Sequence, residues 1–229
     1  MGFKRSLHLR RNGDVGYQEV LHPTTGGEKE SLQRLKLSTV VRIHPWALGV
    51  NMKVNKKLDR ILASTKWLKM VERYFINTKG DINSWTFVER NNSRGAAIAV
   101  AKTPSGSYII IKEFRVPFGD YVYSFPAGMI DNNETPAEAG LRELEEETGY
   151  RGKVRSTSRA LSSSAGLTNE IIYMVYIECD EEPKSHVRLE MSEDIEVFKL
   201  PLYRVSSWLT MNSDKILDAK LYNVLKENI

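Results

Sequence analysis

Short segments rich in apolar and β-branched residues, separated by turn residues, fill the chain from about residue 54 to residue 200. Segments of this kind, bounded by Gly, Pro, Asn, Asp and Ser, are typical of β-strands. The clearest turn is at residues 77–81 (NTKGD), between two such segments. The predicted strands are residues 57–64, 67–76, 84–91, 95–102, 107–116, 121–125, 154–163, 171–179 and 195–200.

Two segments are predicted to be helical. Residues 213–227 carry apolar side chains at helical spacing. The other helix follows Thr135, which is placed as the N-cap, with Pro136 at the first helical position and Glu138 completing a capping box. Gly149 is placed to end this helix. Strands, a helix, more strands and a final helix indicate an α+β fold, in which a mixed sheet lies between helices.

The first quarter of the chain has a different character. Residues 1–60 carry 12 Lys and Arg against 5 Asp and Glu, a net charge of +7, which leaves −3 for the rest. The basic start is faintly similar to a mitochondrial presequence, and the type of structure at residues 31–43 is left open. We divide the chain into a basic extension (1–53), a small β subdomain (54–92) and a larger domain (93–229).

Composition excludes some classes of protein. The 229 residues are 41% hydrophobic, which is enough for a full core. No apolar run approaches the roughly 18 residues that a membrane helix needs, so no membrane association is expected. A single cysteine, Cys179, excludes an internal disulfide and favours a reducing compartment. We predict a cytoplasmic protein, with mitochondria and nucleus left open. A nucleic-acid partner is not favoured, because the larger domain is not basic.

Acidic residues are concentrated in the helix that follows Thr135. Glu143, Glu146 and Glu147 lie at positions i, i+3 and i+4, so three carboxylates project from one face. Like charges repel one another, and a hard divalent cation bound through carboxylate oxygens would offset that repulsion. The pattern therefore favours Mg²⁺, with Mn²⁺ as the second choice. An acidic run can also be a solvated helix face, and the spacing alone leaves both interpretations open.

Residues 128–150 read GMIDNNETPAEAGLRELEEETGY. With Gly, five residues, Glu, seven residues and then REL-x-EE-x-GY, this segment resembles a complete Nudix box. The resemblance implies a Nudix hydrolase, an enzyme that splits a nucleoside diphosphate linked to another group. It implies an α/β/α sandwich with a mixed sheet for residues 93–229, preceded by a small antiparallel sheet.

From about Leu58 onward the chain resembles the ADP-ribose (ADP-sugar) pyrophosphatase branch of that family. The segments that carry this resemblance are residues 66–67, 84–90, 113–117, 125–128 and 166–170. It implies Mg²⁺-dependent hydrolysis of ADP-ribose to AMP and ribose 5-phosphate. Two positions depart from the pattern, because Ser124 stands where many relatives have Glu and Ala165 where ADP-ribose-directed members have Pro. The substrate preference is therefore left open.

The resemblance also implies where the chemistry takes place. Arg142 and Glu134 are expected to order the acidic cluster through an ion pair. The general base is expected at Glu193, with Glu190 and Glu196 as rivals. The expected metal ligands are the Ala127 carbonyl, Glu143, Glu146 and Glu147, and the expected catalytic residues are Glu193 and Glu146.

Substrate binding is expected to involve aromatic stacking and guanidinium donors. By resemblance, Trp67 and Trp85 sandwich the adenine, one from each subunit of a homodimer formed through residues 57–91. Arg90 and Arg115 are expected to bind phosphate or the terminal ribose. Three alternatives are left open: hydrolysis of oxidised nucleoside diphosphates or other nucleotide-sugars, a non-hydrolytic module that senses ADP-ribose, and, more weakly, RNA decapping.

Overall fold

The computed structural model describes residues 6–9, 15–18, 52–54, 56, 59–189, 191 and 193–229. The segment at residues 31–43 lies outside these ranges. The chain divides into two compact units: a first unit of Met1–Ile61 and Val71–Thr86, and a second unit of Leu62–Met70 and Phe87–Ile229. Near the N-terminus, β1 (Ser6–Leu9) and β2 (Val15–Gln18) pair antiparallel.

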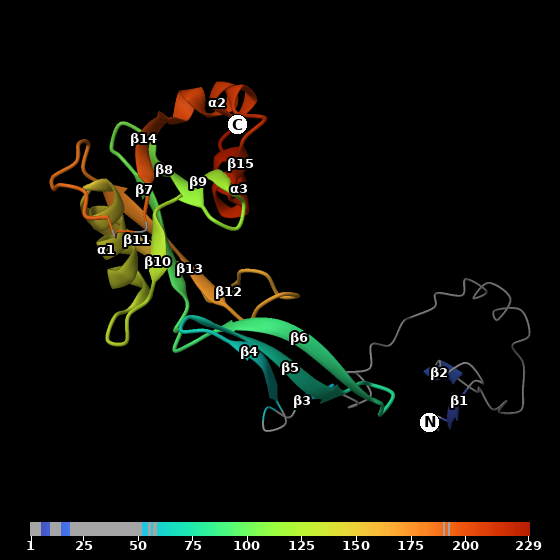
Figure 1. Ribbon diagram of the computed structural model, residues 1–229. Helices are drawn as coiled ribbons and strands as arrows, with labels where there is room; N and C mark the ends of the chain where they lie inside the picture. Colours follow the sequence, from blue (N-terminus) through green and yellow to red (C-terminus); the bar gives the residue numbers. More distant parts are fainter. Residues whose placement is uncertain are drawn as a thin grey trace, which may run out of the picture. The chain divides into compact units, whose positions relative to one another are not determined.

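A small sheet precedes the main one, as predicted (Figure 1). Its strands are β3 (Lys53–Val54), β4 (Arg60–Ser64), β5 (Leu68–Ile76) and β6 (Ile82–Arg90). Their order is β3-β5-β4, and β6 pairs with β5. At the turn between β5 and β6, the side-chain oxygen of Asn77 accepts hydrogen bonds from the backbone of Lys79 and Asp81, at 2.8 and 2.9 Å. Gly80 adopts φ +90°, a conformation that favours glycine.

The main sheet has nine strands and is mixed, which confirms the predicted fold class. The order is β11-β13-β7-β8-β9-β15, while β10 pairs with β7, β12 with β13 and β14 with β8. Two pairs are parallel, β13 with β7 and β15 with β9, and the others are antiparallel. The strands are β7 (Ala96–Lys102), β8 (Ser107–Arg115), β9 (Asp120–Ser124), β10 (Ala127–Met129), β11 (Gly152–Thr157), β12 (Leu161–Ser162), β13 (Ile171–Cys179), β14 (Ile195–Pro201) and β15 (Ile216–Leu217).

The sheet splits between β7 and β8. These strands pair only at one end, where Ala101 and Lys102 lie opposite Ile109 and Tyr108. Beyond that point β7 pairs with β10, whereas β8 pairs with β9 on one side and β14 on the other. An opening is therefore built into the middle of the sheet, and backbone and side chains from both branches line it.

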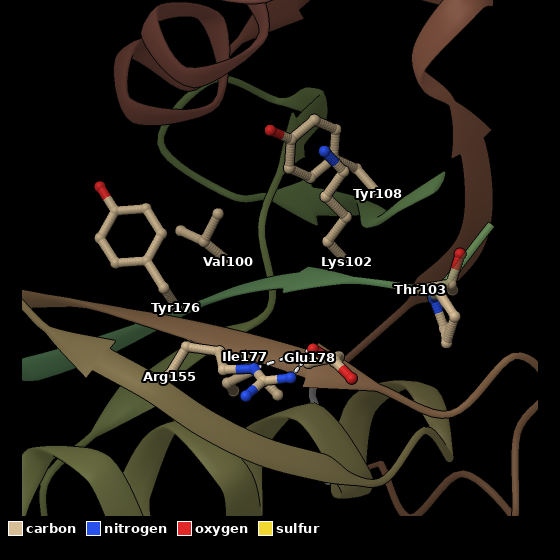
Figure 2. A pocket seen from close by; sticks show the side chains of 9 residues that line it. Val100, Lys102, Thr103, Tyr108, Arg155, Tyr176, Ile177 and Glu178 are labelled. Atoms are coloured by element: carbon tan, nitrogen blue, oxygen red, sulfur yellow. Dashed lines mark hydrogen bonds and ion pairs between the residues drawn. The ribbon is translucent and has the colours of Figure 1, made fainter. Parts of the chain in front are cut away.

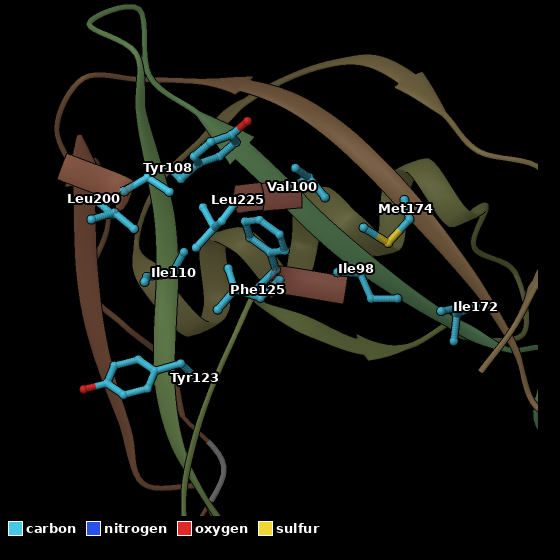
Figure 3. Packing of buried hydrophobic residues seen from close by; sticks show 12 residues of the cluster. Ile98, Val100, Tyr108, Ile110, Tyr123, Phe125, Ile172, Met174, Leu200 and Leu225 are labelled. Atoms are coloured by element: carbon cyan, nitrogen blue, oxygen red, sulfur yellow. The ribbon is translucent and has the colours of Figure 1, made fainter. Parts of the chain in front are cut away.

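Helices cover both faces of the main sheet. Helix α1 (Pro136–Thr148) packs through Ala139 and Leu144 on a cluster that includes Ala97, Ala99 and Ile109. On the other face, Leu221 and Leu225 of α3 (Ala219–Lys226) join a second cluster with side chains from β7, β8, β9 and β13 (Figure 3). The described residues include no helix with the length and hydropathy of a membrane span.

Two predicted elements need correction. The single strand predicted at residues 154–163 is replaced by two, β11 and β12, and between them the Ser158 hydroxyl accepts a hydrogen bond from the backbone of Met174 at 3.0 Å. The final helix begins at Ala219 and not at residue 213, since Asp218 caps it by accepting from the backbone of Lys220 at 2.7 Å. Immediately before this cap, β15 pairs with β9.

Several short elements were not predicted. Among them are β10, the 3₁₀ turn Leu202–Arg204 and helix α2 (Val205–Met211). Each is too short to show a periodic pattern of its own, and its place depends on the strands around it.

Candidate functional site

Helix α1 forms as its local chemistry predicts. The Thr135 hydroxyl accepts from the backbone of Glu138 at 3.2 Å, and the Glu138 carboxylate accepts from the backbone of Thr135 at 2.8 Å. The helix ends at Gly149, whose φ of +74° is left-handed. Both ends are thus fixed by side-chain and backbone chemistry, so the orientation of the acidic face is well defined.

Arg142 ties this face to the loop before the helix. Its guanidinium donates to both oxygens of Glu134, at 2.8 and 3.0 Å, and to the Met129 carbonyl at 2.9 Å. It also donates to Glu143 at 2.7 Å and to Glu146 at 3.0 Å. These contacts lower the pKa of Glu134 and raise that of Arg142. The ion pair expected between Arg142 and Glu134 is therefore present, and it extends to two of the expected metal ligands.

Glu147 is the most deeply buried acidic side chain of the site, with 4% of its surface exposed. Its carboxylate accepts a hydrogen bond from the backbone of Ala127 at 3.1 Å. Burial is the main reason that its pKa rises to about 9, and the charges of Glu143 and Glu113 add to the shift. Burial also raises the pKa of Glu143, against the opposing effect of Arg142. The folded chain holds these carboxylates where an unpaired negative charge is unfavourable.

The backbone of β10 passes directly against the acidic face. A Cβ added to Gly128 would lie 1.8 Å from an oxygen of Glu143, so any other residue would displace that carboxylate from its present position. The donors gathered here are all oxygens, which is the chemistry that a hard divalent cation requires. Among the described residues, no three acidic, His or Cys side chains converge as a ready-made metal site. The guanidinium of Arg142 supplies the positive charge that pairs with Glu143 and Glu146 in this structure.

Glu193 reaches the same region from a different element. It lies directly before β14, where the Asp194 carbonyl accepts from the backbone of Phe114 at 3.2 Å. The charge of Glu193 raises the pKa of both Glu143 and Glu147. The negative charge of Glu193 therefore acts on two carboxylates of α1.

The two rival bases are placed differently. Glu196 lies opposite Lys112 in the register between β14 and β8 and forms an ion pair with it at 3.1 Å. Side chains alternate along a strand, so Glu196 faces away from the side on which Glu113 lies. Glu190 lies outside the described residues.

A cavity of about 330 Å³ opens beside β10. Two ion pairs line this cavity: Arg90 pairs with Glu170, and Lys220 pairs with Asp218 at 2.6 Å. The Ser124 hydroxyl is buried there and has no hydrogen-bond partner among the described residues. The lining residues are Arg90, Ala96, Ile98, Arg115, Ser124, Phe125, Ala127, Gly128, Met129, Ser163, Glu170, Ile172, Asp218 and Lys220.

The expected substrate-binding residues are placed in different surroundings. Arg90 and Arg115 both line the cavity, together with Ala127. Trp67 belongs to the second unit, is 67% exposed and lies one residue before β5, with the Lys66 ammonium 4.4 Å from its ring centre. Trp85 belongs to the first unit, lies in β6 and is 57% exposed. Both rings thus present surface to solvent, as stacking platforms must.

Comparison with known proteins agrees with this geometry. The NUDIX domain model matches residues 92–218, more than half of the chain. This chain belongs to the NUDIX family. The Mus musculus ADP-sugar pyrophosphatase is 32% identical over 180 residues, which cover 72% of this chain and 82% of the relative. The Saccharomyces cerevisiae ADP-ribose pyrophosphatase is 30% identical over 174 residues, covering 69% and 75%.

A solved structure described as an ADP compounds hydrolase shares the fold, with a TM-score of 0.56 at 18% identity. It covers 70% of this chain and 83% of its own. The prediction of a Nudix hydrolase in the ADP-sugar pyrophosphatase branch is confirmed. Nudix hydrolases use divalent metal cations, and the oxygen donors beside Gly128 suit such a cation.

A second hollow in this NUDIX protein has about the same volume, near 340 Å³ (Figure 2). It lies at the opposite end of β7 and β13, where Lys102 is paired with Glu178 in register. Glu178 forms an ion pair with Arg155 and is the one acidic residue among the described residues that line this hollow. The carboxylates of α1 lie instead against the backbone beside the cavity next to β10, which is therefore the candidate NUDIX site.

Several site residues were missed from the sequence. Asp218 and Lys220 come from the C-terminal part of the chain and reach the cavity only because β15 pairs with β9. Glu113 was missed although the sequence contains a signal for it: it follows Ile109 and Ile111 at alternate positions on one face of β8, so a carboxylate stands where that pattern favours another apolar side chain.

Proposed function

We propose that this chain hydrolyses the pyrophosphate bond of ADP-ribose, or of a related ADP-sugar, to AMP and a sugar phosphate, with Mg²⁺ as the cation. The proposal rests on one observation. Arg90, Arg115, Ala127 and Gly128 line the same cavity, and the backbone of Ala127 and Gly128 also contacts Glu147 and Glu143. In an ADP-sugar bound here, the sugar would lie in the cavity and the diphosphate would lie beside the acidic face of α1. The names of the relatives support an ADP-linked substrate.

In this proposal Glu143, Glu146, Glu147 and the Ala127 carbonyl hold the cations. Mg²⁺, when bound, neutralises the diphosphate charge and acidifies a water. Arg142, whose guanidinium pairs with Glu134, Glu143 and Glu146, would keep the loop and the acidic face aligned for the cation.

The remaining residues position the substrate and move a proton. Arg90 and Arg115 donate to the phosphates or to the terminal ribose, a task suited to the planar guanidinium. Glu193 takes the proton of the attacking water, and it is suited to this role because the α1 carboxylates are committed to cation. The ion pairs Arg90–Glu170 and Lys220–Asp218 offer both donors and acceptors to sugar hydroxyls.

The test is a panel of nucleotides incubated with the full chain and Mg²⁺, with products separated by chromatography. The panel contains ADP-ribose, another ADP-sugar, a GDP-sugar and an oxidised nucleoside diphosphate. We expect AMP and ribose 5-phosphate from ADP-ribose. Turnover confined to the GDP-sugar or the oxidised nucleotide would replace the proposed substrate. Calorimetric binding of ADP-ribose without turnover would identify a sensor instead of an enzyme.

We further propose a homodimer formed through residues 57–91, with Trp67 and Trp85 stacking on the adenine. Large apolar side chains are exposed along these strands, among them Ile61, Leu62 and Ile82. An exposed apolar surface of this kind is typical of an interface. The cytoplasm is the compartment we propose, because the single cysteine is buried and free.

Light scattering of the full chain at micromolar concentration is expected to give twice the chain mass of 26.1 kDa. Ile82→Lys should shift the mass towards the monomer, because it places a charge on the proposed interface. Met211→Lys is the matched control, since Met211 is also an exposed apolar residue but lies in α2. A parental mass near 26.1 kDa would exclude the dimer.

A further inference from the structure

Glu113 is a buried carboxylate in an apolar strand. It lies near the end of β8, and only 7% of its surface is exposed. Its row on β8 includes Ile109, which belongs to the cluster under α1, so its side chain is on the α1 face of the sheet. A buried carboxylate is strongly unfavourable unless it is paired and hydrogen-bonded. A position of this kind therefore calls for a compensating positive charge.

The described residues offset the buried negative charge of Glu113 only in part. Arg115 forms an ion pair with Glu113, with its Nη2 atom 2.7 Å from Oε2. This contact does not have the geometry of a hydrogen bond, and Oε2 accepts no hydrogen bond from any described residue. Arg115 is itself half exposed and lines the cavity, so it is not committed to Glu113. Oε2 of Glu113 is therefore buried with an ion pair to Arg115 but without a hydrogen bond from the described residues.

The surroundings of that oxygen are acidic. Ile195 lies opposite Glu113 in the register of β14 and β8, so the segment that carries Glu193 enters the sheet beside it. The charge of Glu193 raises the pKa of Glu113, and the charge of Glu113 raises that of Glu147. The negative charges of Glu113, Glu147 and Glu193 thus act on one another from three elements, and a multivalent cation is a partner that would offset them.

We propose that Glu113 is a further cation-binding residue of this site, and that it contributes an oxygen from β8 opposite the carboxylates of α1. Arg115 is its counter-ion until the cation binds. The guanidinium is then free to donate to the substrate phosphate in the cavity that it lines. This inference rests on the proposed function only for the presence of a divalent cation, not for the identity of the nucleotide.

The test measures Mn²⁺ binding to the full chain without nucleotide, by electron paramagnetic resonance of the free ion. Glu113→Gln keeps the shape of the side chain and removes its charge. We expect a Kd for Mn²⁺ about tenfold higher or more, as for the loss of groups that support a metal site. Glu178→Gln is the matched control, because it also removes a carboxylate paired with an arginine, but at the distant hollow.

A second variant separates direct binding from an effect through Arg115. If Glu113 is a ligand, Arg115→Gln should leave Mn²⁺ affinity unchanged or improve it, because the competing counter-ion is removed. Parental Mn²⁺ affinity in a folded Glu113→Gln protein would overturn the proposal, and so would equal weakening by Arg115→Gln. Because no nucleotide is present, a parent that binds Mn²⁺ but hydrolyses no ADP-sugar would refute the proposed function and leave this inference standing.

Discussion

Replacement of Glu147 by Gln is expected to lower kcat by about 10³-fold at saturating Mg²⁺. A cation stabilises the charge of the transition state by several kcal/mol, and each 1.36 kcal/mol lost corresponds to about tenfold in rate. Glu147 has the largest effect among the acidic residues because it is almost fully buried and lies between Ala127 and Glu143. Turnover of ADP-ribose under single-substrate steady-state conditions measures the loss.

Glu145→Gln is the control for this experiment. Glu145 lies on the same helix but pairs with Arg151 at 2.8 Å, so its replacement should leave kcat near the parental value. Equal turnover by Glu147→Gln and the parent would remove Glu147 from the cation site.

Thermal unfolding of the cation-free proteins checks that the fold is kept. The pKa of Glu147 rises from 4.5 to about 9 on folding, so the folded chain holds a proton that the unfolded chain releases above about pH 4.5. The free energy of unfolding of the parent therefore falls as the pH rises from 4.5 towards 9. Glu147→Gln lacks this contribution, and its Tm should equal or exceed that of the parent at pH 8.

Replacement of Glu193 by Gln is expected to lower kcat by about 10²-fold, the size of effect typical of a lost general base. Mn²⁺ affinity should change little, because the proposed role of Glu193 is to accept a proton and not to hold cation. A loss in kcat with nearly unchanged cation binding distinguishes Glu193 from Glu147 and Glu113, for which both quantities should change.

Glu196→Gln is the matched control, since Glu196 lies on the opposite face of β14 and pairs with Lys112. Normal turnover by Glu193→Gln, together with a large loss in Glu196→Gln or Glu190→Gln, would move the role of base to that residue.

Local chemistry explains which parts of this site could be predicted. The start of α1 depends on Thr135 and Glu138, three residues apart, and its end on Gly149, so its bounds follow from the sequence alone. The acidic face then follows from helical periodicity. Arg142 was expected to pair within the cluster, and it does so.

Long-range pairing explains what could not be predicted. Residues 216–217 continue an apolar helical stripe, yet they form β15 because β9 offers an edge on which they pair. Ser158 looks like any polar residue of a strand until its hydroxyl meets the backbone of Met174. The cavity combines Lys220 with Arg90 only through the order of strands in the sheet, which no local pattern encodes.

The segment before β14 is attached in a way that should restrict its length in related sequences. The backbone of Arg188 donates to the Glu146 carbonyl at 2.7 Å, and the Asp194 carbonyl accepts from Phe114, so the short span carrying Glu193 is held at both ends. One residue gained or lost within it would move Glu193 along the sheet or slip β14 by one position, which would turn every side chain of that strand to the other face.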